Sequence, residues 1–172
     1  MNVRSVIEKI FPGTHNGKKT GLALGGGAVL GAAHVGVLRA IEEYGIKVDA
    51  VAGTSIGALV AALYAFGRDW KDIGEVARHL HWFDISSVSP SQYGLLNNQK
   101  MGKKICDLLG DVTFKDTLIP LAIVTADISS GEKVVLREGN VGNAVMASSC
   151  IPGIFKPVQH DGRMLVDGGI ME

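Results

Sequence analysis

Residues 48–63 read VDAVAGTSIGALVAAL, a short apolar run, a glycine-containing turn and a longer apolar run. This pattern predicts a buried strand that enters a sharp turn and then a buried helix. Because Gly53 and Gly57 carry no Cβ atom, the strand can reverse tightly into the helix with Ser55 at the apex. A Gly-x-Ser-x-Gly sequence between a strand and a helix indicates a nucleophile elbow.

The position of Ser55 in such a turn suits acyl transfer. Its hydroxyl stands clear of the backbone, above the N-terminus of the following helix. The free N–H groups and the partial positive charge of that helix end stabilise an oxyanion beside the serine. A Gly-Ser turn without any chemistry has the same five letters, because short patterns also arise by chance. The rest of the chain has to distinguish these two interpretations.

A second strand–turn–helix unit precedes the first. Residues 20–25 predict a strand, and the glycine-rich turn at 25–31 leads into a helix that ends near Tyr44. Such a turn binds anions through converging backbone N–H groups. A dinucleotide site is disfavoured because Gly-x-Gly-x-x-Gly is not matched and Asp49 begins, rather than ends, the second strand. An oxyanion hole explains the turn better, since successive parallel strands bring both turns to one sheet edge.

The serine needs a base to remove its proton. Asp167 ends a predicted strand, directly before two glycines, so we expect its carboxylate at the sheet edge that presents Ser55. A plain Asp-Gly-Gly turn is the alternative for these residues. Among the histidines, His160 lies in a predicted loop and is the alternative base, whereas we expect His34 to pack inside its helix.

Four motifs together resemble the patatin-like phospholipase family. Residues 26–31, 53–57, 147–155 and 167–169 occur in the order and rough spacing typical of that family. The resemblance implies an α/β fold, a three-layer α/β/α sandwich with a mainly parallel central sheet. It also implies lipid acyl hydrolysis by a Ser–Asp dyad, without histidine, metal or organic cofactor.

The family's site residues transfer position by position. Ser55 is then the nucleophile, Asp167 the base, and the backbone oxyanion donors are Gly26, Gly27 and Ala28. The positions expected to support these motifs are Gly31, Gly53, Gly57, Gly168 and Gly169. Ala28 and Leu30 replace a glycine and an arginine that the family usually has, so the backbone N–H groups are kept but a positive charge is lost.

Domain organisation follows from the same comparison of motifs. We expect an amphipathic segment at residues 1–19 and an acyl hydrolase domain at 20–172 that is incomplete at its C-terminus. Apolar residues of the first segment recur at the spacing of one helix face: Val3, Val6, Ile7, Ile10 and Phe11. This face either docks on the domain's own core or makes a peripheral contact with lipid at the inner membrane surface.

The charge balance, the first residues, the cysteines and the apolar runs each indicate the class of protein. The 17 basic and 17 acidic residues balance, so bulk charge gives no support for nucleic acid as a partner. The first residues lack the apolar run of a secretory signal, and Cys106 and Cys150 are expected to be reduced, which favours the cytoplasm. Two uncharged runs, 20–38 and 50–67, are interrupted by glycines where turns are expected, so we interpret them as buried strand–helix pairs.

The remaining elements are predicted from periodicity. We expect helices at 70–80, 101–109 and 140–149, strands at 119–127, 133–137 and 163–166, and a long loop at 84–98. The helix before Tyr44 should bury a face made of Val37, Ala40, Ile41 and Tyr44. His79 and His81 lack further ligands at metal-binding spacing, so we expect no metal site there.

The sequence therefore predicts a serine acyl hydrolase whose substrates are phospholipid or lysophospholipid esters. The alternative is a catalytically silent domain of the same fold that binds a lipid or a protein partner. Nucleotide binding at the glycine-rich turn is the weakest of the three hypotheses.

Overall fold

The computed structural model describes residues 19–27, 31–79 and 99–171. The amphipathic segment with Val3 to Phe11, the predicted loop at 84–98, and both Ala28 and Leu30 lie outside the described residues. The helices and strands are otherwise close to those predicted, and they are as follows: β1 Gly21–Leu24, α2 Gly31–Glu43, β2 Ala50–Thr54, α3 Ile56–Ala65, α4 Trp70–His79, α5 Gln99–Leu109, β3 Leu121–Asp127, β4 Glu132–Leu136, α6 Val141–Ser148, β5 Val158–His160 and β6 Arg163–Asp167. Two 3₁₀ helices span Phe114–Asp116 (η3) and Gly168–Met171 (η4).

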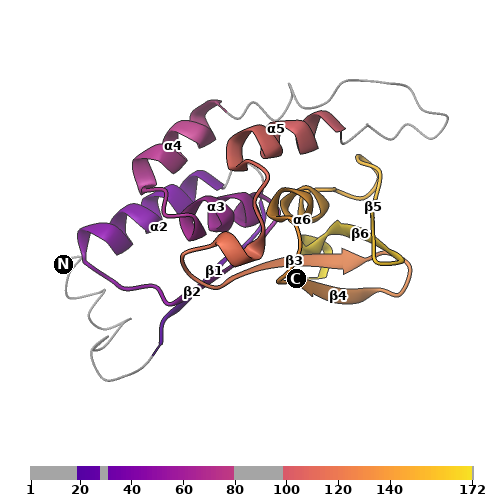
Figure 1. The fold of residues 1–172 in the computed structure, drawn as a ribbon, viewed down its shortest axis with the longest axis horizontal. Coiled ribbons are helices and arrows are strands. Elements are labelled where there is room, and N and C mark those ends of the chain that lie inside the picture. The colour runs from indigo at the N-terminus through magenta and orange to yellow at the C-terminus, as the bar shows by residue number, and fades with distance from the viewer. Residues whose placement is uncertain (1–18, 28–30, 80–98, 172) are drawn as a thin grey trace.

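The strands of the described residues form one mixed sheet (Figure 1). β1, β2 and β3 run parallel, in that order. β4 and β6 are antiparallel to β3, and β5 is antiparallel to β6. The two strand–turn–helix units therefore occupy neighbouring parallel strands, as predicted, and their turns emerge at the same end.

β2 and β6 share one edge of β3. β4 occupies one edge of β3 along residues 123–127. β2 pairs with residues 121–124 and β6 with residues 125–127, so both must lie on the other edge. The two strands meet there with their carboxyl ends facing each other, because β2 is parallel to β3 and β6 is antiparallel to it.

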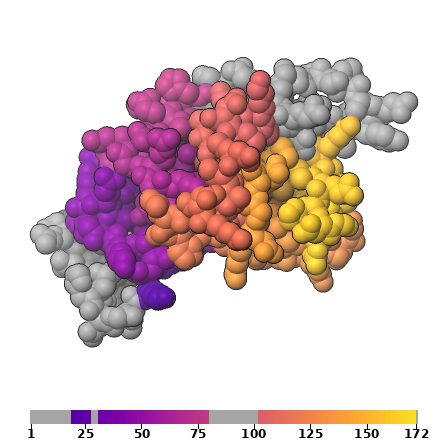
Figure 2. All heavy atoms as spheres, in the orientation of Figure 1, coloured from indigo at the N-terminus to yellow at the C-terminus, as the bar shows by residue number. Residues whose placement is uncertain are grey.

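α3 is the central helix of the core. Its sequence is apolar all round, which predicts a helix surrounded by other elements. All but one of its residues are buried, and it packs against β2, β3 and α6. α6 covers β3 and β6, while α2 and α4 pack against each other beside α3 (Figure 1). In the space-filling view, α5 and the following segment separate α2–α4 from the β5–β6 region (Figure 2).

The buried face of α2 differs from the prediction. Val37 and Tyr44 are 44% and 40% exposed, whereas Leu38 is 1% exposed. α2 contacts its neighbours through Gly31 and Val35, which lie one turn apart on the same side of the helix. Gly31 lies against Ile56 of α3, and Val35 faces Gly74 of α4. Close packing against two helices therefore decides which side is buried, and only Ile41 of the predicted face packs against the core.

Both long apolar runs are divided as expected. The run at 20–38 contains β1 and part of α2, and the run at 50–67 contains β2 and α3. Within the described ranges, no helix has the length and apolar character required to span a bilayer. Neither Cys106 nor Cys150 is joined in a disulfide bond within the described residues.

Candidate active site

Ser55 lies on a strained turn between β2 and α3. Its backbone dihedral angles are φ 55° and ψ −125°, a positive φ that residues with a Cβ atom rarely adopt. Such a conformation costs on the order of 1–3 kcal/mol and persists only where the surrounding structure enforces it. The structure thus places Ser55 at a sharp turn between a strand and a helix, where it is only 9% exposed.

The two glycines of the elbow are explained by backbone contacts. A Cβ atom on Gly53 would collide with the carbonyl group of Gly57. A Cβ atom on Gly57 would collide in turn with the carbonyl oxygen of Leu24, the last residue of β1. The first turn of α3 thus crosses directly over the ends of β1 and β2, which leaves no room for side chains at either position.

The glycine-rich turn after β1 lies beside Ser55. A Cβ atom built on Gly26 would be 3.3 Å from the Cβ atom of Ser55. Gly27 has φ 128°, which favours glycine, and the Nε2 atom of His34 lies 2.9 Å from the carbonyl oxygen of Gly25. Since a carbonyl only accepts, that ring nitrogen carries the proton. His34 is therefore a support for the turn, a role beyond the simple packing that we predicted from sequence.

Asp167 is the last residue of β6 and is 7% exposed. Its backbone N–H donates to the carbonyl oxygen of Cys150 at 2.9 Å, and its Oδ1 atom accepts from the N–H of Gly169 at 2.8 Å. Position 168 requires glycine, because a Cβ atom there would lie 2.6 Å from the carbonyl oxygen of Val124 and collide with it. The Asp-Gly-Gly sequence thus forms a tight turn at the end of β6, and this turn packs closely against the backbone of β3.

Ser55 and Asp167 come from strand ends that meet on β3. Thr54 pairs with Val124, and Asp167 pairs with Thr125, the next residue of β3. The reason differs from the one inferred from sequence: β6 is antiparallel to β3, and it is the register of β6 that brings Asp167 to the end of β2. The described structure contains no direct hydrogen bond between Ser55 and Asp167. Catalytic hydrogen bonds are often long without substrate.

One contact to the elbow was not foreseen. The Ser55 N–H donates to the hydroxyl of Ser148 at 2.8 Å, and that hydroxyl donates to the carbonyl oxygen of Val124 at 2.7 Å. Ser148 ends α6 and is completely buried. The only signal in the sequence is a pair of serines, Ser148 and Ser149, at the end of a mainly apolar helix.

The alternative base and the nucleotide hypothesis find no support in these positions. His160 lies in strand β5 and not in the predicted loop, because residues 158–160 pair with β6. It pairs with Arg163 at the beginning of β6, and its ring lies 3.5 Å from Asp161. Four residues of strand, roughly 13 Å, separate that end of β6 from Asp167. Asp49 accepts from the Thr20 N–H at 2.8 Å, so its carboxylate joins the starts of β1 and β2, away from the glycine-rich turn.

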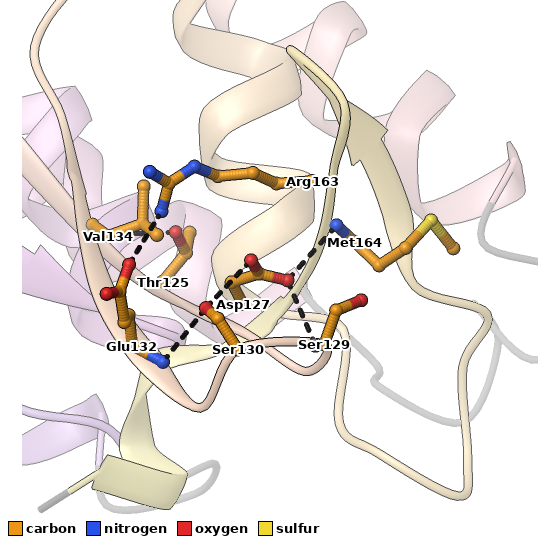
Figure 3. Close-up of polar contacts among 8 residues, drawn as sticks. All are labelled: Thr125, Asp127, Ser129, Ser130, Glu132, Val134, Arg163 and Met164. Carbon is orange, nitrogen blue, oxygen red and sulfur yellow. Dashed lines mark hydrogen bonds and ion pairs between the residues drawn. The ribbon is translucent and has the colours of Figure 1, made fainter.

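A second buried carboxylate, Asp127, closes the turn between β3 and β4 (Figure 3). Its oxygens accept from the Ser129 N–H at 3.0 Å, the Ser130 hydroxyl at 2.9 Å and the Met164 N–H at 3.3 Å. These hydrogen bonds, that from Ser129 above all, hold the pKa of Asp127 below its ordinary value. Asp127 thereby ties the start of β6 to the β3–β4 turn. Within the described ranges, no three His, Cys, Asp or Glu residues gather as ligands for a metal ion.

The fold and the elbow define an α/β protein with a strained serine at a strand–helix turn. Comparison with known families agrees, because the model of the patatin-like phospholipase family matches residues 22–172. The chain therefore belongs to the patatin-like phospholipase family, as its motifs indicated.

Curated relatives give the same assignment. Uncharacterized NTE family proteins of Mycobacterium bovis and Mycobacterium tuberculosis are 34% identical over 163 residues, which is 90% of this chain and 43% of theirs. The neuropathy target esterase of Drosophila melanogaster is 35% identical over 161 residues, 89% of this chain and 11% of that protein. The chain thus spans less than half the length of these relatives.

Solved structures share the fold. VipD from Legionella pneumophila superimposes with a TM-score of 0.74 at 17% identity, over 90% of this chain and 46% of VipD. ExoU of Pseudomonas aeruginosa, solved in complex with SpcU, gives a TM-score of 0.57 at 19% identity, over 76% of this chain and 38% of that chain. The predicted α/β class, a mixed sheet with flanking helices, is confirmed.

Proposed function

We propose that this chain is the acyl hydrolase domain of a lipid esterase, with phospholipid or lysophospholipid esters as substrates. Membership of the patatin-like phospholipase family supports hydrolysis of lipid esters, and the relative named neuropathy target esterase supports it further. The single observation that carries the proposal for these residues is the meeting of β2 and β6 along one edge of β3. A strained serine and a buried carboxylate are thereby brought to neighbouring positions.

In the proposed mechanism, Asp167 accepts the proton of the Ser55 hydroxyl as the serine oxygen attacks the ester carbonyl. The backbone N–H groups of Gly26, Gly27 and Ala28 then stabilise the negative oxygen of the tetrahedral intermediate. The alcohol leaves with a proton from Asp167, and an acyl-enzyme on Ser55 remains. A water molecule activated by Asp167 hydrolyses it. These steps need no metal or organic cofactor.

Two contacts of Ser55 bear on which groups could bind the oxyanion. Gly26 lies against Ser55, so a carbonyl attacked by the serine would come within reach of this turn. The N–H of Ser55 is already bonded to Ser148, so it is not free to act as an oxyanion donor. The donors are therefore expected from the turn and from the N-terminus of α3.

The N-terminal segment, residues 1–19, has a role of its own in this proposal. Its apolar helical spacing suits a peripheral contact with the membrane that holds the substrate. Deletion of residues 1–19 should then weaken hydrolysis of esters in vesicles while hydrolysis of a dispersed short-chain ester is unchanged. Equal losses on both substrates would contradict a membrane role and favour packing on the domain.

A catalytically silent binding domain is the second candidate, favoured by the missing hydrogen bond between Ser55 and Asp167. An alkyl fluorophosphonate, which reacts only with an activated serine, distinguishes the two candidates. The proposal predicts labelling of the wild-type chain, mapped by mass spectrometry to Ser55, and none of Ser55→Ala. Lysophospholipid hydrolysis should fall by 10³-fold or more in Ser55→Ala. Labelling that is absent, or equal in both chains, would exclude the hydrolase.

A further inference from the structure

The strand ladder between β2 and β3 continues in regular steps up to the elbow. The N–H of Val51 donates to the carbonyl oxygen of Pro120 at 2.9 Å, and Thr54 pairs with Val124. In a parallel ladder, successive bonds advance two residues on each strand. The same register would therefore join the N–H of Ser55 directly to the carbonyl oxygen of Val124.

The hydroxyl of Ser148 occupies that place instead. It accepts from the Ser55 N–H at 2.8 Å and donates to the Val124 carbonyl oxygen at 2.7 Å, so it is inserted into the last bond of the ladder. Both backbone groups remain satisfied although β2 has begun to separate from β3. The side chain is completely buried at the end of α6, which leaves it no alternative partner in water.

We propose that Ser148 is a positioning residue that holds Ser55 in its positive-φ conformation by keeping the last bond of the β2–β3 ladder open. This proposal rests on the proposed function, because it concerns the nucleophile of that reaction. Ser148 does not touch the reacting atoms; it acts through the backbone of Ser55.

Removal of the Ser148 hydroxyl should change the backbone conformation of Ser55. In Ser148→Ala, the Ser55 N–H and the Val124 carbonyl either stay unpaired in a buried place or close into the direct ladder bond. Closing the bond extends β2 by one residue and removes the positive φ that presents the Ser55 hydroxyl. A displacement of about 1 Å at a reacting group lowers the rate by about 10²-fold. Substrate binding, which does not use this contact, should be unaffected.

Ser149→Ala is the matched control. Ser149 is the next residue, is also buried, and its hydroxyl also donates to a backbone carbonyl, that of Val145 at 2.8 Å. Its bond closes within α6 and reaches neither β2 nor β3. Both variants lose one buried hydroxyl, and only Ser148→Ala loses the contact with Ser55.

The experiment measures kcat and KM for a lysophospholipid, together with the rate of fluorophosphonate labelling. We expect kcat and labelling to fall 10- to 100-fold in Ser148→Ala with KM unchanged, and both to stay within threefold of wild type in Ser149→Ala. Ser148→Cys keeps a weaker donor and acceptor of similar shape, and we expect a partial rescue. Equal rates in Ser148→Ala and Ser149→Ala would overturn the proposal.

NMR spectroscopy separates this inference from the proposed function. The backbone amide and Cα shifts of Ser55 should move in Ser148→Ala, toward extended values if the bond closes, and should be unchanged in Ser149→Ala. If the wild-type chain is inactive, the proposed function fails, and unchanged Ser55 shifts in Ser148→Ala would still refute the positioning role. If Ser148→Ala does not fold, the same measurements on Ser148→Cys decide.

Discussion

Two buried aspartates, Asp127 and Asp167, end strands that pair with each other in the same sheet. Both oxygens of Asp127 are engaged, by two backbone N–H groups and the Ser130 hydroxyl. Among the described residues, one donates to Asp167, the Gly169 N–H to Oδ1, and none donates to its Oδ2. The environments of two similar carboxylates thus differ in the number of donors that surround them.

This difference separates a structural carboxylate from a candidate base. Three hydrogen bonds, two to Oδ1 and one to Oδ2, stabilise the charged form of Asp127. The free oxygen of Asp167 is available to a further donor, and the end of β2 with Ser55 lies beside it. Burial alone would not have distinguished the two residues. The following predictions test whether this contrast corresponds to a division between stability and catalysis.

The largest effect is expected for Asp167→Asn. The amide keeps an oxygen for the Gly169 N–H but is not a base, so kcat/KM should fall by about 10³-fold with little change in the melting temperature. Lysophospholipid hydrolysis and thermal unfolding of the same preparation measure both quantities. Asp127→Asn is the matched control, with activity per folded molecule near wild type. Equal activity losses in the two variants would erase the contrast between the carboxylates.

The two turns should also differ in their need for glycine. At the elbow, Gly57→Ala forces a Cβ atom against the carbonyl oxygen of Leu24, a backbone atom that cannot rotate away. We expect the free energy of unfolding to fall by about 3 kcal/mol. Urea unfolding followed by circular dichroism measures it.

Gly131→Ala in the β3–β4 turn is the comparison for this variant. Gly131 has φ 72° but nothing within 4 Å of an added Cβ atom. Only the backbone conformation is penalised, which costs about 1 kcal/mol. If Gly131→Ala destabilises the chain as much as Gly57→Ala, steric contact is not the reason for the elbow glycines.

The smallest effect should be the pH dependence that Asp127 contributes. Because its folded pKa is lowered, its stabilisation is present above the unfolded pKa of about 3.9 and is lost as the pH falls through the folded value. The melting temperature of wild type should therefore exceed that of Asp127→Asn at pH 7, and the gap should shrink below about pH 4. A gap that stays constant from pH 7 to pH 3 would show that the charge of Asp127 is not what stabilises the turn.

Much of the site was predictable because its constraints are local. The positions of Gly53 and Gly57 relative to Ser55 are fixed by one sharp turn, and a turn leaves its mark in consecutive residues. The buried helix α3 was equally predictable, because its sequence is apolar without interruption. Asp167 was recognisable only together with the other motifs, since an Asp-Gly-Gly turn is common in isolation.

Other features depend on contacts between distant residues. The buried side of α2 was predicted incorrectly because Gly31 and Val35 pack against two other helices, which periodicity within α2 does not reveal. The link from Ser148 to Ser55 spans 93 residues of sequence and passes through a single hydroxyl. No local pattern distinguishes that hydroxyl from its neighbour, Ser149.

The sequence by itself determined the sharp turn at Ser55 and most of the strands and helices, because each follows from backbone geometry over a few adjacent residues. The tertiary structure alone decided that β6 runs antiparallel and meets β2 on one edge of β3, and that Ser148 enters the ladder there. Register between strands is set by the packing of the whole sheet. That packing brings the ends of β2 and β6 together, and with them Ser55 and Asp167.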